Sequence, residues 1–154
     1  MQPSFQELVN KRVKMILDII DYYSINMQYR QSVPERYDQP HANLMITSSA
    51  GNDPATTAAI AKIIDPKRDI YVTGTHSSAK RFVEDILECD CAYLVARKRG
   101  VKEFADMYFE QRNNTTKMVR VFINNTGDFD FHRIVQMLGN LARKYDFKIM
   151  FIVV

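Results

Sequence analysis

The stretch that decides the fold is DIYVTGTHSSAKRFVEDIL, residues Asp69 to Leu87. A short β-rich run, Ile70 to Val72, is followed by Gly74 and a small polar loop. After the loop, apolar residues recur at helical spacing, at Phe82, Val83, Ile86 and Leu87. A strand, a tight polar turn and a helix form the half-unit of an α/β sheet. Free backbone N–H groups and the helix dipole at such a turn favour anionic ligands.

The same alternation of strand and helix continues on both sides of this stretch. Strands are expected at Leu44 to Ile46, Ala92 to Ala96, Met118 to Ile123 and within the apolar run Phe147 to Val154. Helices are expected at Ala55 to Ile64, at Val101 to Gln111 with Phe104, Met107 and Tyr108 buried, and at Phe129 to Tyr145 with Ile134, Val135, Leu138 and Leu141 inward. Continuous apolar strands are typical of parallel sheets that are covered on both faces. We therefore predict an α/β fold, a three-layer Rossmann-like sandwich with a mostly parallel sheet of about five strands.

A single domain, residues 1–154, is expected from the chain length. It divides into an amphipathic N-terminal helix (1–32), a linker (33–43) that contains Pro34 and Pro40, and a sheet core (44–154). Ser4 and Glu7 form a capping-box pattern at the start of the helix. Its apolar stripe is Leu8, Val9, Val13, Ile16, Leu17, Ile20, Tyr23 and Met27. Such a stripe packs either on the sheet or on a partner subunit, and both interpretations stay open.

Charge and hydropathy argue against a nucleic-acid binder and against a membrane protein. The chain has 21 Lys and Arg against 18 Asp and Glu, a net charge of +3, which is less basic than a nucleic-acid binder of this size. The basic cluster Arg97, Lys98, Arg99 and Lys102 is expected to be a solvated turn, so a nucleic-acid partner is not favoured. No signal-peptide pattern and no apolar run of membrane-spanning length occurs. A cytoplasmic location with no membrane association is therefore expected.

No metal site and no cofactor are expected. Cys89 and Cys91 form a C-x-C pair whose side chains point to opposite sides of an extended chain, and no His cluster accompanies them. They are expected to be buried or half-buried free thiols in a reducing compartment. No G-x-G-x-x-G motif follows a strand, which argues against a dinucleotide.

Three turns after strands carry the candidate chemistry: Thr47 to Asp53, Gly74 to Ser78 and Asn124 to Asp128. Hydroxyl groups and glycine amides offer a phosphate many donors and little bulk. The candidate ligand-binding residues are Gly74, Thr75, His76, Ser77, Ser78, Asn124, Asn125, Thr126, Gly127 and Asp128. The alternative is that these residues only cap the helix that follows each turn. No catalytic residue is assigned.

The turn at Gly74 resembles the P-loop, G-x-x-x-x-G-K-[ST], in part. Gly74 and Lys80 have the required spacing, but Ala79 replaces the second glycine and Arg81 replaces the Ser or Thr that holds magnesium. The strand at Val119 to Ile123 also ends in Asn124 rather than in an aspartate. Hydrolysis of a nucleoside triphosphate needs these groups, so it is not expected here.

Two motifs resemble those of the SIS (sugar isomerase) domain, a family that binds phosphosugars in isomerases and in sugar-sensing regulators. Ile70 to Ser78 (IYVTGTHSS) resembles its strand-G-x-G-x-S motif, with His76 at the second glycine and Ser77 or Ser78 as the serine. Phe122 to Phe129 (FINNTGDF) resembles its strand-S-x-S-G-x-T motif. There Gly127 matches the glycine, Thr126 stands for the second serine, Asn124 replaces the first serine and Phe129 replaces the threonine. The resemblance covers residues 55–154 and implies a phosphosugar site at the two turns.

The expected function is therefore binding rather than catalysis. The favoured hypothesis is a non-catalytic domain that binds a phosphosugar or another phosphorylated small molecule. The alternative is a degenerate, pseudo-NTPase-like interaction module that forms a homo- or hetero-oligomer through its N-terminal helix.

Overall fold

The deciding stretch forms a strand, a turn and a helix in the computed structural model, which describes residues 4–31, 41–45, 54–112, 118–124, 129–145 and 148–154. In chain order the elements are α1 (Phe5–Gln31), β1 (His41–Met45), α2 (Pro54–Ile63), β2 (Ile70–Thr73), α3 (His76–Arg81), the π-helical segment η1 (Phe82–Leu87), β3 (Ala92–Val95), α4 (Val101–Arg112), β4 (Met118–Ile123), α5 (Phe131–Tyr145) and β5 (Lys148–Val153). Strands and helices alternate from β1 onward, as the sequence predicts.

The strands are parallel and lie in the order β1-β5-β4-β2-β3. The prediction of an α/β fold with a parallel sheet is thus confirmed. β1 begins at His41, inside the predicted linker, because its backbone already pairs with β5 there, opposite Ile149. From β2 the chain moves outward to β3, then crosses back to β4 and continues to β5, so the strand order reverses between β2 and β4. Crevices for ligands form at such a reversal point, at the carboxyl ends of the strands.

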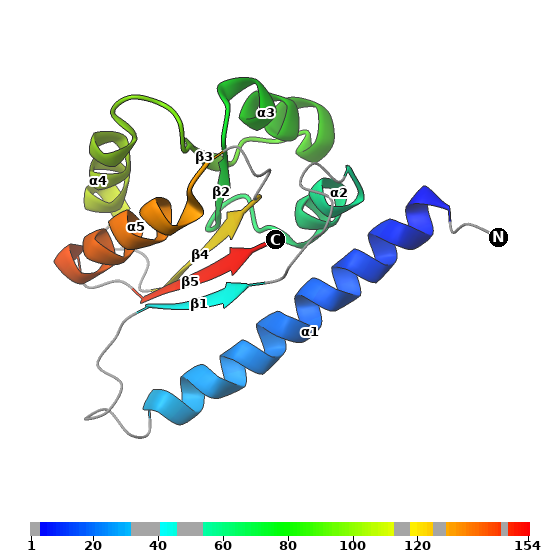
Figure 1. The fold of residues 1–154 in the computed structure, drawn as a ribbon, viewed down its shortest axis with the longest axis horizontal. Helices are drawn as coiled ribbons and strands as arrows, with labels where there is room; N and C mark the ends of the chain where they lie inside the picture. The colour runs from blue at the N-terminus through cyan, green and yellow to red at the C-terminus, as the bar shows by residue number, and fades with distance from the viewer. Residues whose placement is uncertain (1–3, 32–40, 46–53, 113–117, 125–128, 146–147) are drawn as a thin grey trace.

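Helices cover both faces of the sheet (Figure 1). The face that carries α1, α2 and η1 receives Tyr71, Phe122 and Ile152, whereas the face under α4 and α5 receives Val72 and Phe151. Neighbouring residues of a strand point to opposite faces, so each strand must be apolar on both sides. This explains the continuous apolar runs in the sequence.

Helix α1 begins as the capping box predicts, with the Glu7 N–H donating to Ser4 Oγ at 3.2 Å. Its buried residues are Val9, Ile16 and Ile20, and the helix packs against α2. These residues of the predicted stripe therefore contact the same chain, whereas Leu8 and Leu17 of the stripe are exposed. Within the described ranges, no helix is both long and apolar enough to cross a membrane.

The helix after Gly74 changes form at Phe82. The Phe82 ring stacks on Tyr71, with ring centroids 3.7 Å apart and an angle of 6° between the planes. From that residue the helix has the wider π-helical turn, and it ends at Glu88, which has a φ of 59°. The widening thus begins at the aromatic contact that ties the helix to the sheet.

The prediction of which face of α4 is buried is wrong. Phe104 and Met107 are 45% and 50% exposed, and Tyr108 is only half-buried. Ala105 and Phe109 are fully buried instead. These two residues are four positions apart and share one helix face, and the small Ala105 side chain allows that face to approach the sheet. The prediction was based on the largest apolar residues of the helix, which lie on the face next to the one that is buried.

The two cysteines point to different environments, as predicted, but only Cys91 is buried. The prediction that Cys89 is buried or half-buried is wrong, because Cys89 is exposed. It lies in the irregular segment between η1 and β3, where no element packs over its side chain.

A partly buried ion pair joins the start of β4 to the residue before β2, at the end of the sheet opposite the predicted turns. The Arg120 guanidinium donates from Nε to Asp69 Oδ1 at 3.1 Å and from Nη2 to Asp69 Oδ2 at 2.6 Å. The Asp65 N–H also donates to Asp69 Oδ2, at 2.7 Å. Asp69 is buried, so these donors replace the water that its carboxylate has lost.

Candidate functional site

A cleft of about 620 Å³ lies where the strand order reverses, on the sheet face between α2 and η1. We call it the switch cleft. It is lined by Phe5 of α1, by Pro54, Thr57 and Ala58 of α2, by Tyr71 and Thr73 of β2, by Ser78, Arg81, Asp85 and Ile86 of α3 and η1, and by Asn124 after β4. The lining residues thus come from elements that are far apart in the sequence.

Asn124 joins three of these elements. Its side-chain Nδ2 donates to Tyr71 Oη at 2.8 Å and to Thr57 Oγ1 at 3.0 Å. Its backbone N–H donates to the carbonyl of Val72 at 2.9 Å, which extends the pairing of β4 with β2. The side chain is buried, so these contacts hold the inner side of the cleft in one arrangement.

The inner side of the switch cleft is uncharged. Burial raises the pKa of the Tyr71 phenol above its usual value of 10.0, although the hydrogen bond from Asn124 and the nearby Thr73 hydroxyl act in the opposite direction. Tyr71 therefore stays neutral near pH 7. Thr73 is fully buried, and its Oγ1 completes no hydrogen bond of good geometry within the described residues. This part of the cleft offers neutral hydroxyl and amide groups.

The charged residues of the switch cleft lie at its rim. Arg81 is the cation among the described lining residues and Asp85 is the anion. Arg81 is exposed, and it forms no ion pair within the described part of the chain. Ser78 lies on the same helix three residues earlier, so its hydroxyl and the Arg81 guanidinium are on the same helix face.

The Gly74 turn behaves largely as the capping alternative predicts. Thr75 is the N-cap of α3, and its Oγ1 accepts the Ser78 N–H at 3.2 Å and donates to Ser78 Oγ at 2.9 Å. Gly74 is buried, and its carbonyl accepts the N–H of Arg97 at 3.3 Å. Thr75 and Ser77 are not among the residues that line the switch cleft, whereas Ser78 is.

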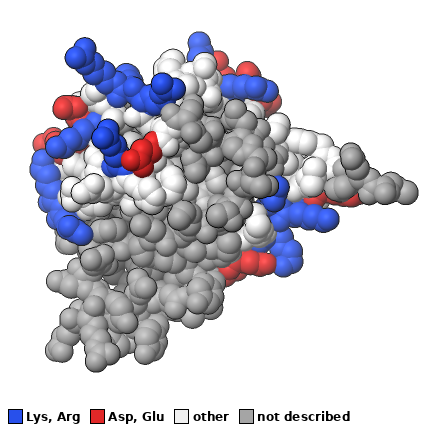
Figure 2. Space-filling model, viewed as in Figure 1, with Lys and Arg blue, Asp and Glu red and all other residues white. Residues whose placement is uncertain are grey.

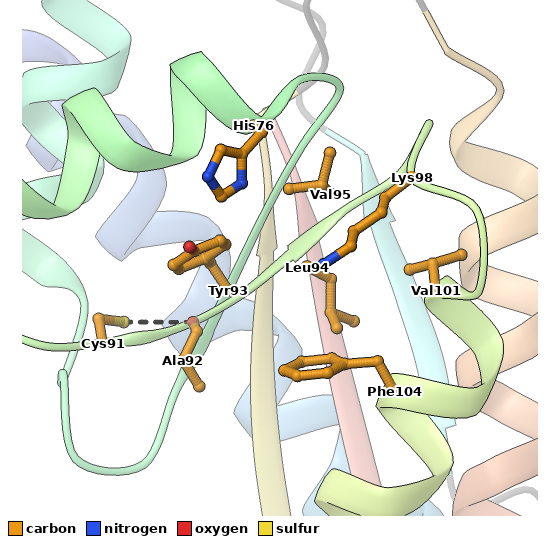
Figure 3. Close-up of a pocket in the computed structure, with 9 residues that line it drawn as sticks. All are labelled: His76, Cys91, Ala92, Tyr93, Leu94, Val95, Lys98, Val101 and Phe104. Atoms are coloured by element: carbon orange, nitrogen blue, oxygen red, sulfur yellow. Dashed lines mark hydrogen bonds between the residues drawn. The ribbon is translucent and has the colours of Figure 1, made fainter.

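His76 lies outside the switch cleft. It lines a separate groove beside β3, where its ring centroid is 6.2 Å from that of Tyr93 (Figure 3). In the second predicted turn, Asn124 lines the switch cleft, but Asn125, Thr126, Gly127 and Asp128 lie outside the described residues, as does the turn at 47–53. The structure therefore brings together Ser78 and Asn124, one residue from each of two predicted turns.

Nine of the eleven lining residues were not predicted as site residues, and Thr57, Tyr71, Thr73 and Arg81 are among them. Tyr71 and Thr73 carried a usable signal, because polar groups two residues apart on an apolar strand point to the same face. Arg81 was noted only as a departure from the P-loop pattern. Thr57 had no signal, since its place opposite Asn124 depends on how α2 packs.

The basic turn before α4 is exposed, which fits the prediction of a solvated turn. Arg97, Lys98 and Arg99 are exposed and form no ion pair within the described residues. Figure 2 shows Lys and Arg along the margin where this turn, α4 and α5 lie in Figure 1, with Asp and Glu among them. Within the described ranges, no three His, Cys, Asp or Glu residues gather as metal ligands would.

No protein-family model, no curated protein and no solved structure matches this chain. The resemblance to the SIS domain therefore remains an expectation from two short motifs.

Proposed function

We propose that this protein binds a phosphorylated small molecule in the switch cleft. The observation that carries the proposal is the combination of Arg81 at the rim, a cation that forms no ion pair with any described residue, and the neutral hydrogen-bonded inner side of Tyr71 and Asn124. The volume of about 620 Å³ is in the range of small-molecule sites, which are about 300–1,000 Å³. The cleft also lies at the reversal of strand order, where parallel sheets bind ligands.

The two ends of the cleft suit different parts of such a ligand. At the rim, the Arg81 guanidinium offers two parallel donors to a phosphate, and the Ser78 hydroxyl adds a third. Deeper in the cleft, Thr57 and Asn124 present neutral polar groups to hydroxyl groups of the ligand body. Asp85 at the rim accepts hydrogen bonds from hydroxyls and disfavours a second phosphate.

We also infer that the architecture is a Rossmann-like three-layer sandwich with about five strands. Support comes from the two core clusters, one on each face of the sheet, and from the reversal of strand order between β2 and β4. This architecture places the ends of β2 and β4 at the centre of the binding edge.

The proposal is tested by a thermal-shift screen of matched pairs of compounds, each with and without its phosphate, followed by calorimetry on any hit. Arg81→Gln removes the charge and should weaken binding of the phosphorylated member by at least about tenfold, the loss of one charge-assisted contact. Lys80→Gln is the matched control, because Lys80 is adjacent and exposed but does not line the cleft. Equal affinity for both members of a pair, or equal loss in both variants, would contradict a phosphate site at Arg81.

The second candidate function is a protein-interaction module that uses α1. Phe5, Leu8 and Leu17 are exposed on this helix, although its buried face already contacts α2. Deleting the helix would uncover the core, so Leu8→Glu/Leu17→Glu is the sharper change. Light scattering should show a smaller assembly for the variant than for the original chain. An unchanged molar mass would exclude oligomerisation through these exposed residues of α1.

A further inference from the structure

β3 is an edge strand with an open side. It pairs with β2, and within the described residues no strand lies on its other side. The Ala96 N–H donates to the carbonyl of Thr73 at 2.8 Å, so the backbone groups of Leu94 and Ala96 face β2. Because these groups alternate along a strand, both backbone groups of Tyr93 and the N–H of Val95 face the open side, whereas the Val95 carbonyl accepts the Lys98 N–H at 3.0 Å. Unpaired groups at a sheet edge are a template for another strand.

A groove of about 260 Å³ runs along this open edge. Tyr93 and His76 lie on one side of the strand, and Leu94 and Phe104 lie on the other (Figure 3). The Lys98 side chain reaches into the groove from the end of the strand (Figure 3). The lining is mostly apolar, which is unusual for an edge that only meets water.

Exposed apolar side chains of α4 flank the same edge. Phe104 lines the groove and is exposed, and Met107 is exposed one turn further along the helix. Residues three positions apart are neighbours on a helix surface, so the exposed Met107 extends the apolar surface that Phe104 begins at the groove. These are the residues that the sequence predicted to be buried within the chain.

The charges at the two ends of β3 have opposite signs. Glu88 and Asp90 precede the strand and are exposed, whereas Arg97, Lys98 and Arg99 follow it and are exposed. A second copy of β3 that runs antiparallel would place the acidic start of each strand beside the basic end of the other. Because a two-fold axis repeats every contact, each favourable pair occurs twice.

The backbone restricts the register of such a pair. A residue with both backbone groups on the open side lies opposite its equivalent in such a pair, so Tyr93 pairs with Tyr93 of the other copy. The charged residues lie beyond the extended part of the strand, Ala92–Val95, so they bring an acidic and a basic segment together at each end of the pair without fixed residue partners.

We propose that two copies of this chain associate through antiparallel pairing of their β3 strands, which joins their sheets into one. Phe104 and Met107 of the two α4 helices cover the seam on one face. An unrelated acidic peptide would use the basic end alone, whereas both charged ends of the strand match a second copy. The proposal does not depend on a ligand in the switch cleft.

Charge exchange in the full-length chain tests this pairing. The base-exchanged variant is Arg97→Glu/Lys98→Glu, and the acid-exchanged variant is Glu88→Lys/Asp90→Lys. In sedimentation velocity, the original chain should dimerise and each variant alone should dimerise at least about tenfold more weakly, because like charges then face each other. An equal mixture of the variants should form a heterodimer with restored affinity. The control Lys11→Glu/Arg143→Glu changes exposed charges elsewhere and should dimerise as the original chain does.

Residue-level hydrogen exchange on the unmodified chain is independent of any effect of the substitutions on folding. The amides of Tyr93 and Val95 should exchange at least about tenfold more slowly at concentrations that favour the dimer than in dilute solution. A monomeric original chain overturns the proposal. So do variants that dimerise as well as the original, a mixture that stays monomeric, or exchange at Tyr93 that does not depend on concentration.

Discussion

Replacing the buried Asn124 with alanine should destabilise the protein more than the loss of an exposed amide side chain does. The substitution removes the donors to Tyr71 Oη at 2.8 Å and Thr57 Oγ1 at 3.0 Å. A hydrogen bond contributes about 1 kcal/mol net, and a buried polar atom left without its partner costs about 1–3 kcal/mol. Tyr71 is buried, so the expected loss is about 2–4 kcal/mol of unfolding free energy.

Urea denaturation measures this loss directly. The midpoint should fall while the slope of unfolding free energy against urea stays unchanged, because the surface exposed on unfolding is nearly the same. In a thermal scan each kcal/mol should lower Tm by about 2–4 °C for a chain of this length. Asn140→Ala is the control, since Asn140 is exposed on α5, and its effect should stay within about 0.5 kcal/mol.

A double-mutant cycle with Tyr71→Phe isolates the hydrogen bond between Asn124 and Tyr71. Phenylalanine keeps the ring that stacks on Phe82 and removes only the hydroxyl. The two changes together should cost about 1 kcal/mol less than the sum of the separate changes, the usual size of such a coupling. A coupling near zero, or a loss for Asn124→Ala no larger than for Asn140→Ala, would refute the view that Asn124 holds the inner side of the cleft together.

Three further predictions concern stability. Asp69→Ala removes the buried carboxylate that the Arg120 guanidinium and the Asp65 N–H contact and should cost about 2–3 kcal/mol, whereas Asp18→Ala breaks an exposed pair and should leave the urea midpoint nearly unchanged. Gly100 has a φ of 83°, so Gly100→Ala should cost about 1–2 kcal/mol in urea, and a neutral result would mean that the turn relaxes freely. Burial raises the pKa of Tyr71, so its contribution to stability is complete below pH 10 and is lost as pH rises through its higher folded value. In the Tyr71→Phe variant, Tm should fall less steeply above pH 10 than in the original chain. A fall as steep as in the original chain would contradict the view that ionisation of Tyr71 causes it.

Much of the architecture could be predicted because its signals are local. The apolar run before Gly74, the capping box at Ser4 and the apolar face of α5 each lie within one element, and all three appear in the structure. Where two neighbouring faces of a helix are both apolar, local spacing is ambiguous. In the packed structure α4 buries Ala105 and Phe109 and leaves Phe104 and Met107 exposed. A pattern of large apolar residues does not reveal this preference, because it depends on how closely the helix approaches the sheet.

The candidate site was predicted in part. Ser78 and Asn124 follow strands, so their place at one edge of the sheet follows from parallel strand order. His76 comes from the same turn as Ser78 but faces the open edge of β3 instead, because successive residues of a helix point in different directions.

The sequence by itself therefore determined the order of strands and helices and the edge at which polar turns gather, since both follow from hydrophobic periodicity and turn chemistry within short segments. Only the tertiary structure decided that Thr57, Tyr71 and Asn124 meet and that the two ends of β3 stand at an open edge. Those contacts join residues up to 67 positions apart. They depend on which strands become neighbours and which helix covers each face, and packing of the whole core selects both.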